Sequence, residues 1–158
     1  MTRYLNSLNI GMLICDDCEQ EGRKLLEISG IKDELQLDGQ NKTSFTFIAD
    51  YNFIEFEIPE NEDIVSFRFF IRTLGGTPAY VIPFIVAEMG LSEDVDGVMT
   101  QRMPMIMKVD NFEFPRRGKF AIEVYKHFGK IDKRLEDENV EYYRKRENFV
   151  NAISFEVI

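Results

Sequence analysis

Tryptophan is absent from this chain of 158 residues, histidine occurs once, and cysteine occurs twice. A Ser-His-Asp triad needs a nucleophile and an acid beside its histidine, and a structural zinc site needs four ligands. His127 is the one histidine, and Cys15 and Cys18 have no second cysteine pair to complete a zinc site. Neither G-x-S-x-G nor the phosphate-binding G-x-x-x-x-G-K occurs. These absences argue against the common catalytic constellations, and no metal or cofactor is predicted.

Long apolar runs are also missing. No segment approaches the roughly 18 apolar residues of a membrane span, and Asp16 and Asp17 directly follow the short run IGMLIC near the start. The net charge is −9, which repels both phosphate backbones and anionic lipid head groups. We therefore predict a cytoplasmic protein with reduced cysteines that binds neither nucleic acid nor membrane.

Apolar and polar residues alternate in most of the chain, which is typical of half-buried β-strands. The pattern predicts strands at 10–15, 25–29, 44–48, 54–58, 64–73, 79–89, 103–109, 120–124 and 152–158. The strands 10–15 and 25–29 are expected to form a hairpin with a long polar tip. Pro83 predicts an edge strand, a bulge or a break in its segment, and Asp110 and Asn111 predict a turn.

The stretch FEFPRRGKFAIEVYKHFG (112–129) predicts a tight turn that enters a strand. Pro115 already has the φ angle that a turn requires, and Gly118 can adopt a positive φ. The helix predicted in the chain covers 133–147, where acidic residues precede basic ones and so suit the helix dipole.

These segments predict an all-β, mainly antiparallel fold in one domain, residues 1–158, with 131–158 as a C-terminal extension of helix and strand. We expect a β-sandwich of about seven to nine strands, Ig-like or jelly-roll-like, with one short helix near the C-terminus. A β-barrel is the alternative.

Two groups of charged residues are candidate binding sites. Asp16 and Asp17 are adjacent, so on a strand they point to opposite faces, which is a poor geometry for an acid/base pair. Arg116, Arg117 and Lys119 form a modest basic patch on an acidic protein, and the two arginines are expected to be solvated at a turn. Such a patch suits docking of an acidic partner segment.

Two stretches resemble an uncharacterised bacterial family of short proteins. MLICDDCEQEGRKLLEISGI (12–31) is similar to that family's opening, C-D-D followed by G-K-L and a strand ending in G-I. FEFPRRGKFAIEVYKHFG is similar to its closing hairpin, F-P-x-x-G-x-Y/F. The resemblance implies an antiparallel β-sandwich of unknown function and supplies no catalytic residues. The chain departs from the family with Arg23-Lys24 where the family has G-K.

Three functions are compatible with the sequence. The leading prediction is a non-enzymatic β-sandwich that binds another macromolecule or itself through its exposed strand edges. The second is a carbohydrate- or small-ligand-binding module in which exposed tyrosines stack on a sugar, with Tyr51, Tyr80, Tyr125, Tyr142 and Tyr143 as candidates. The third is a hydrolase that uses Asp16, Asp17 or His127.

Overall fold

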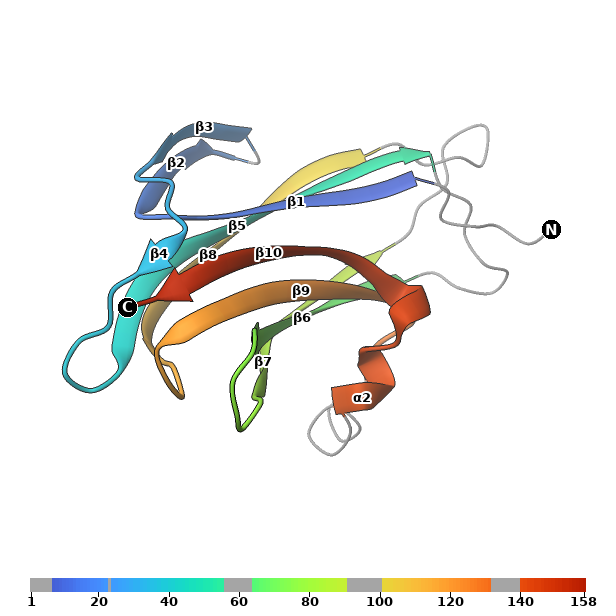
Figure 1. Cartoon of the computed structure of the whole chain (residues 1–158). Coiled ribbons are helices and arrows are strands. Elements are labelled where there is room, and N and C mark those ends of the chain that lie inside the picture. Colours follow the sequence, from blue (N-terminus) through green and yellow to red (C-terminus); the bar gives the residue numbers. More distant parts are fainter. Residues whose placement is uncertain (1–6, 23, 56–63, 91–100, 132–139) are drawn as a thin grey trace.

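The computed structural model describes residues 7–22, 24–55, 64–90, 101–131 and 140–158 (Figure 1). The described part of the chain contains ten strands: β1 (Ser7–Cys15), β2 (Asp17–Glu21), β3 (Lys24–Ser29), β4 (Glu34–Leu35), β5 (Lys42–Glu55), β6 (Ile64–Thr73), β7 (Val81–Gly90), β8 (Gln101–Glu113), β9 (Gly118–Phe128) and β10 (Phe149–Val157). A short helix, α2 (Val140–Tyr143), and a 3-10 turn, η1 (Arg146–Asn148), precede β10. None of the described helices has the length and apolar character needed to cross a membrane.

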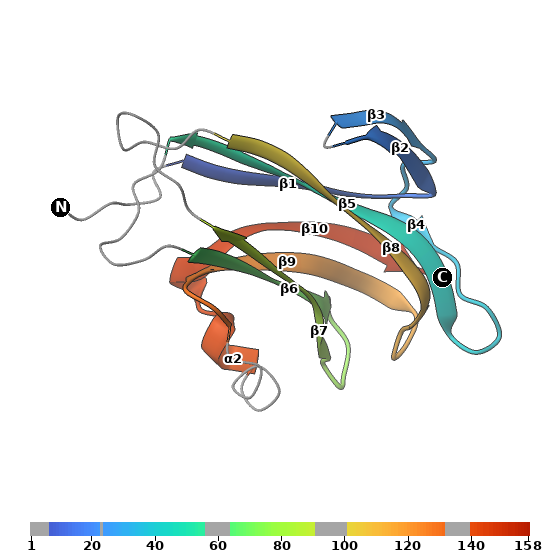
Figure 2. The same ribbon diagram turned by 180° about the vertical axis from the view of Figure 1, so that it is seen from behind.

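The strands form two curved sheets and a separate hairpin. One sheet has the order β1-β5-β8, the other has the order β4-β10-β9-β6-β7, and β2 pairs with β3. The short β4 runs parallel to β10, and the other pairs are antiparallel. Figures 1 and 2 show the two sheets facing each other and curling like half a barrel. The all-β, mainly antiparallel prediction with a short C-terminal helix is confirmed, in a form that lies between an open sandwich and its barrel alternative.

One side of this half-barrel is held by a polar contact between the sheets. Asn151 on β10 donates its side-chain N–H to the Ile10 carbonyl oxygen on β1, at 2.8 Å. β10 itself lies between β4 and β9, so the last strand of the chain is an interior strand of the five-stranded sheet.

The core between the sheets is built largely from phenylalanine. Alternation along β6 turns Phe67, Phe69 and Ile71 inward, and all three are fully buried. The Phe47 ring of β5 meets the Phe69 ring edge-on at 5.6 Å and the Phe84 ring of β7 at 5.5 Å. Edge-to-face contacts of this kind add to the free energy gained by burying the rings. The predicted alternation therefore locates the interior correctly in both sheets.

The strand pairing near the N-terminus differs from the prediction. β1 pairs with β5, and the polar segment expected to be a hairpin tip is itself the strand β2, paired with β3. β5 runs unbroken from Lys42 to Glu55, through the gap expected between the strands at 44–48 and 54–58, and residues 56–58 lie outside the described part. Pairing partners are decided by which strands share a buried face, and the alternation within one segment carries no information about its neighbour.

Two further boundaries are corrected. β8 continues through Asp110 to Glu113 instead of turning there, although Asn111 has the positive φ of 52° that a turn residue would favour. The helix predicted over 133–147 ends at Tyr143, and residues 132–139 lie outside the described part. Pro83 is placed as expected, because β7 is an edge strand and its register with β6 shifts beside Pro83.

Candidate functional site

A groove on the outer side of the three-stranded sheet brings Asp16 and Asp17 together. Asp16 lies at the bend between β1 and β2, so the expectation that the two carboxylates point to opposite faces of one strand is wrong. The groove has a volume of about 290 Å³ and is lined by Asp16, Asp17, Ser44, Phe45, Thr46, Lys108, Val109 and Asp110. The hydrolase candidate His127 is not among these lining residues.

Two lysines neutralise the groove carboxylates. Lys32 forms an ion pair with Asp16, and the Lys108 Nζ lies 3.5 Å from the Asp17 Oδ1. Both pairs have solvent-exposed partners, so each contributes little to stability. Gly30 packs directly beside the Asp16 carboxylate and has a φ of +68°, so a side chain at this position would collide with Asp16 and strain the backbone.

Cys15 and Cys18 flank the two aspartates, and both are unbridged. Burial raises the pKa of the Cys15 thiol, and the negative charges near it act in the same direction against the opposing effect of Lys32. A raised pKa keeps Cys15 as a poor nucleophile at neutral pH. Within the described ranges, no cluster of three or more His, Cys, Asp or Glu residues could hold a metal ion.

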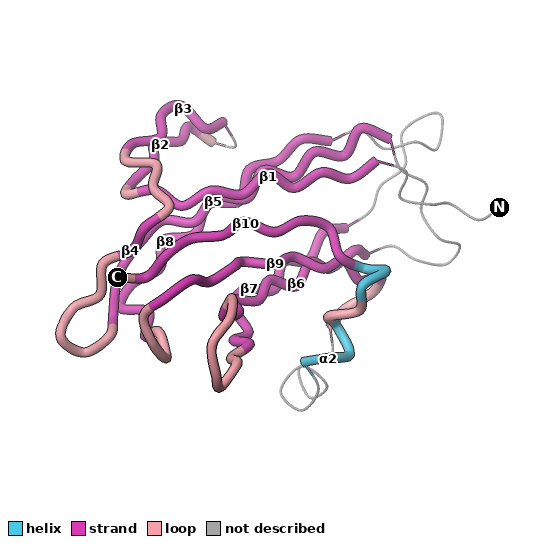
Figure 3. The backbone as a smooth tube through the Cα atoms, viewed as in Figure 1, coloured by secondary structure: helices cyan, strands magenta, loops and turns pink. Residues whose placement is uncertain are grey.

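The predicted basic patch is divided by the structure. Arg116 is half-buried and joins the β8–β9 turn to the β6–β7 loop, two neighbouring loops in Figure 3. Its guanidinium donates to the carbonyl oxygens of Pro78, at 2.8 Å, and Gly75, and it lies 5.8 Å from the Tyr80 ring centre. The expectation that Arg116 is a solvated turn residue is therefore wrong.

The other two members of the patch lie apart from these contacts. Arg117 is exposed. Lys119 lines a second groove, of about 390 Å³, with the three acidic residues Asp33, Glu34 and Glu156. This groove is open and mixed in charge, so the patch does not present the single basic surface that docking of an acidic segment would need.

The outer face of the five-stranded sheet holds a buried charge cluster that the sequence did not indicate. Glu123 on β9 is 6% exposed and binds two arginines, with the Arg72 Nε at 2.9 Å and the Arg144 Nη2 at 3.1 Å. Arg68 is 2% exposed, and its guanidinium lies 5.0 Å from the Phe70 ring centre. The segment around α2 covers this face, so charged side chains of β6 and β9 that would otherwise face solvent are buried.

Ionisation in this cluster follows from burial and from neighbouring charges. Burial raises the pKa of Tyr125, the charge of Glu123 acts in the same direction, and Arg144 opposes both. Burial alone would lower the pKa of Arg144, but the hydrogen bond and the charge of Glu123 outweigh it and raise that pKa. Arg144 is therefore a permanent cation here, and the cluster holds α2 against the sheet.

Three of the five tyrosines considered for sugar stacking are buried. Tyr51, Tyr125 and Tyr143 are 1%, 6% and 3% exposed, so their rings cannot be reached by a ligand. Tyr80 and Tyr142 are exposed, and each lies beside a cation, Arg116 for Tyr80 and Lys145 for Tyr142. The His127 ring contacts Tyr143 at 5.3 Å, on the α2 side of the molecule.

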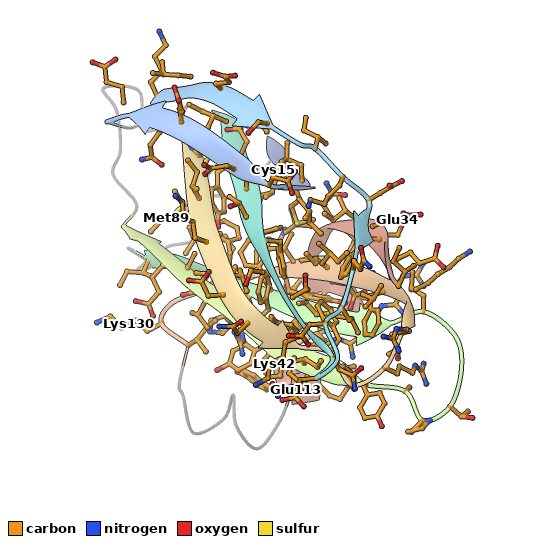
Figure 4. All side chains as sticks on the ribbon, turned by 90° about the vertical axis from the view of Figure 1, so that its left-hand side faces the viewer. Cys15, Glu34, Lys42, Met89, Glu113 and Lys130 are labelled. Atoms are coloured by element: carbon orange, nitrogen blue, oxygen red, sulfur yellow. The ribbon has the colours of Figure 1, made fainter. Side chains whose placement is uncertain are left out.

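The open edge of β8 is a structural feature that the sequence pattern missed. Among the strands that the structure describes, β8 pairs with β5 and with no other strand. It borders the groove of Asp16 and Asp17, and its last residue, Glu113, lies beside Lys42 of β5 in Figure 4. The expected turn at Asp110 concealed the edge, because it divided a continuous strand of 13 residues.

Backbone hydrogen bonds decide which groups face this edge. The carbonyl oxygens of Ile10 and Ile14 on β1 accept hydrogen bonds from groups outside the sheet. Because successive residues of a strand direct their backbone groups to opposite sides, the β1 residues that alternate with these two form the hydrogen bonds to β5. The same alternation, carried across β5, directs the backbone groups of Met105, Met107 and Val109 to β5. β8 has a bulge opposite Ser44, between Val109 and Phe112, and there the Asn111 N–H donates to Ser44 Oγ at 3.0 Å. Because the peptide bond is trans, the Asp110 carbonyl oxygen points away from that N–H, to the open edge.

It follows that Ile106, Lys108 and Asp110 direct their backbone N–H and C=O groups to the open edge. Pro104 occupies the next position of the same parity, and a proline within a sheet is tolerated where its missing N–H would face away from a neighbour. The side chains of these residues alternate with Met105, Met107 and Val109, which pack against the core. The edge therefore offers an ordered row of hydrogen-bonding groups.

The chain matches no protein-family model, and a search of curated proteins returns no match.

Proposed function

We propose that this protein is a non-enzymatic binding module that accepts an extended segment of a protein partner along the open edge of β8. The observation that carries the proposal is the outward direction of the backbone groups of Ile106, Lys108 and Asp110 on an edge strand. An unpaired strand edge is a template on which another strand adds by main-chain hydrogen bonds. The groove beside it supplies pockets for alternate side chains of the added strand.

The anchoring of β8 to β5 and to the core supports this function. β8 is held by a long register with β5, and Met105, Met107 and Val109 anchor it to the core. A preformed strand loses little conformational entropy when a partner binds, so more of the interaction free energy appears as affinity.

A photo-reactive residue placed at the edge tests the proposal. We would replace Asp110 by benzoylphenylalanine, produce the protein in its host, irradiate the cells and identify adducts by mass spectrometry. The matched control carries the same residue at Ala152, an exposed position on β10 in the other sheet. We expect a discrete protein adduct from position 110 and none from position 152.

A proline variant separates edge binding from simple proximity. Ile106→Pro removes one outward N–H, whereas Met107→Pro removes an N–H directed to β5 and destabilises the sheet. Ile106→Pro should stay folded and lose the adduct formed at position 110. Absence of an adduct in the unmutated background, or an adduct that survives Ile106→Pro, would overturn the proposal.

A further inference from the structure

We infer that the segment bound at the β8 edge is β8 of a second copy of this chain, paired antiparallel about a two-fold axis at Val109. This inference rests on the proposed function and names its partner. The resulting assembly has one continuous sheet in the order β1-β5-β8-β8-β5-β1. The charges and backbone groups of five neighbouring positions, Ile106 to Asp110, decide how the two strands pair.

Parity limits the possible registers. Two copies of β8 form hydrogen bonds only where outward-facing residues lie opposite each other, so Ile106, Lys108 and Asp110 must face members of the same set. In an antiparallel pair about a two-fold axis, the axis then passes through one of these residues or midway between two of them. The candidate axes lie at Ile106, Met107, Lys108, Val109 and Asp110.

Charge selects one register from this set. An axis at Lys108 places two lysines directly opposite each other, and an axis at Asp110 places two aspartates opposite each other. Like charges at directly opposite positions destabilise a sheet. An axis at Val109 places Lys108 of each copy opposite Asp110 of the other, which forms two opposite-charge pairs on the same face.

Pro104 disfavours the two registers whose axes lie at Met107 and Ile106. An axis at Met107 places Pro104 opposite Asp110, and an axis at Ile106 places Pro104 opposite Lys108, and in each case the proline has no N–H to donate. With the axis at Val109, each Lys108–Asp110 pair exchanges both N–H···O bonds across the edge. This register alone, of the five, combines complementary charge with complete hydrogen bonding at its centre.

The groups needed for this pairing are accessible. Lys108 is 68% exposed in its side chain, and its contact with Asp17 is a solvent-screened pair at 3.5 Å. Asp110 is exposed and lines the same groove. Lys108 is therefore free to reach Asp110 of the second copy at little cost.

A charge-exchange series tests the register. We would measure the dimer dissociation constant by sedimentation equilibrium for the unmutated chain, Lys108→Asp, Asp110→Lys and the double variant. Each single change turns both attractive pairs repulsive because of the two-fold axis, so we expect a roughly tenfold to hundredfold weaker dimer. The double variant restores opposite charges at both pairs and should recover the dimer.

Lys145→Asp is the matched control, since it makes the same charge reversal at an exposed lysine beside α2 and leaves both cross-strand pairs intact. It should leave the dissociation constant within a few-fold of the unmutated value, and circular dichroism should show every variant folded. A monomer at all micromolar concentrations, or a double variant no tighter than the single ones, would overturn the inference. A position-110 adduct to a different protein would then still support edge binding, whereas no adduct at all would overturn both.

Discussion

The two faces of the five-stranded sheet are both largely buried over β6 and β9, but they are built from different chemistry. The inner face carries Phe69, Ile122 and their neighbours, and it packs against the other sheet with apolar contacts. The outer face carries Arg68, Arg72 and Glu123, and the segment around α2 covers it. The comparison shows that period-2 alternation identifies two faces correctly and leaves the solvent exposure of the second face undecided.

The energetic consequence differs between the faces. Apolar burial is non-directional and stabilises in proportion to area, so the inner face accounts for most of the stability of the sheet. A buried ion pair regains in attraction roughly what its groups lose in hydration, and it becomes costly when one partner is removed. Substitutions on the two faces should therefore destabilise the protein by different mechanisms.

The largest effect is expected on the inner face. Phe69→Ala leaves a cavity between the sheets and removes the edge-on contact with Phe47, so we expect unfolding to become easier by about 4 kcal/mol. Urea denaturation followed by circular dichroism measures this. Phe149→Ala is the matched control, because Phe149 is 44% exposed, and it should cost about 1 kcal/mol or less. Equal losses in the two variants would contradict the assignment of the core.

An intermediate effect is expected on the outer face. Glu123→Gln keeps the shape of the side chain and leaves Arg72 and Arg144 without their shared counter-charge. We expect a loss of about 2 kcal/mol, below the usual value for a broken buried pair because Arg72 reaches solvent. Glu141→Gln removes the exposed partner of the same Arg144, and its cost should stay under about 0.5 kcal/mol. If Glu141→Gln proves as destabilising as Glu123→Gln, the outer face is not a buried cluster.

The smallest effect on stability concerns two tyrosines: Tyr51 of β5, which packs against the inner face, and Tyr125 of β9, on the outer face. Burial raises the pKa of Tyr51 in the core and, to a smaller extent, that of Tyr125 on the outer face, both above the ordinary value of 10.0. A raised pKa means that the fold favours the neutral hydroxyl, so the stabilisation is complete below 10.0 and is lost as pH rises through the folded-state value. The slope is at most about 1.4 kcal/mol per pH unit for each group.

Denaturation at about pH 8 and about pH 11 measures this loss. Tyr51→Phe should remove more of it than Tyr125→Phe, because the Tyr51 hydroxyl is the more strongly shifted. A larger reduction in Tyr125→Phe would show that the outer face excludes water better than the core does.

Local pattern predicted several elements well. The turn before β9 and the start of that strand follow from the turn chemistry around Pro115 and Gly118 and from alternation in β9. The edge position of β7 follows from Pro83, since proline lacks the N–H that an interior strand needs. These predictions succeeded because their causes lie within a few residues of each other in the sequence.

Local sequence patterns predicted the candidate site less well. Asp16 and Asp17 share a groove because the chain bends between β1 and β2, where the Asp16 N–H donates to the carbonyl oxygens of Ser29 and Gly30. Arg116 does not form part of a solvated basic patch, because its guanidinium donates hydrogen bonds to two carbonyl oxygens of the β6–β7 loop. Each outcome depends on a partner in another segment of the chain, which no local pattern can reveal.

By itself, the sequence determined that the chain forms antiparallel strands, where most of them lie, and which side chains of each strand point inward. These properties follow from the two-residue period of an extended backbone and from the free energy of removing phenylalanine from water. The tertiary structure decided which strands are neighbours, which strand was left at the open edge of its sheet, and which charged residues were covered. Those outcomes depend on contacts between distant segments, whose free energies are summed only when the whole chain has folded.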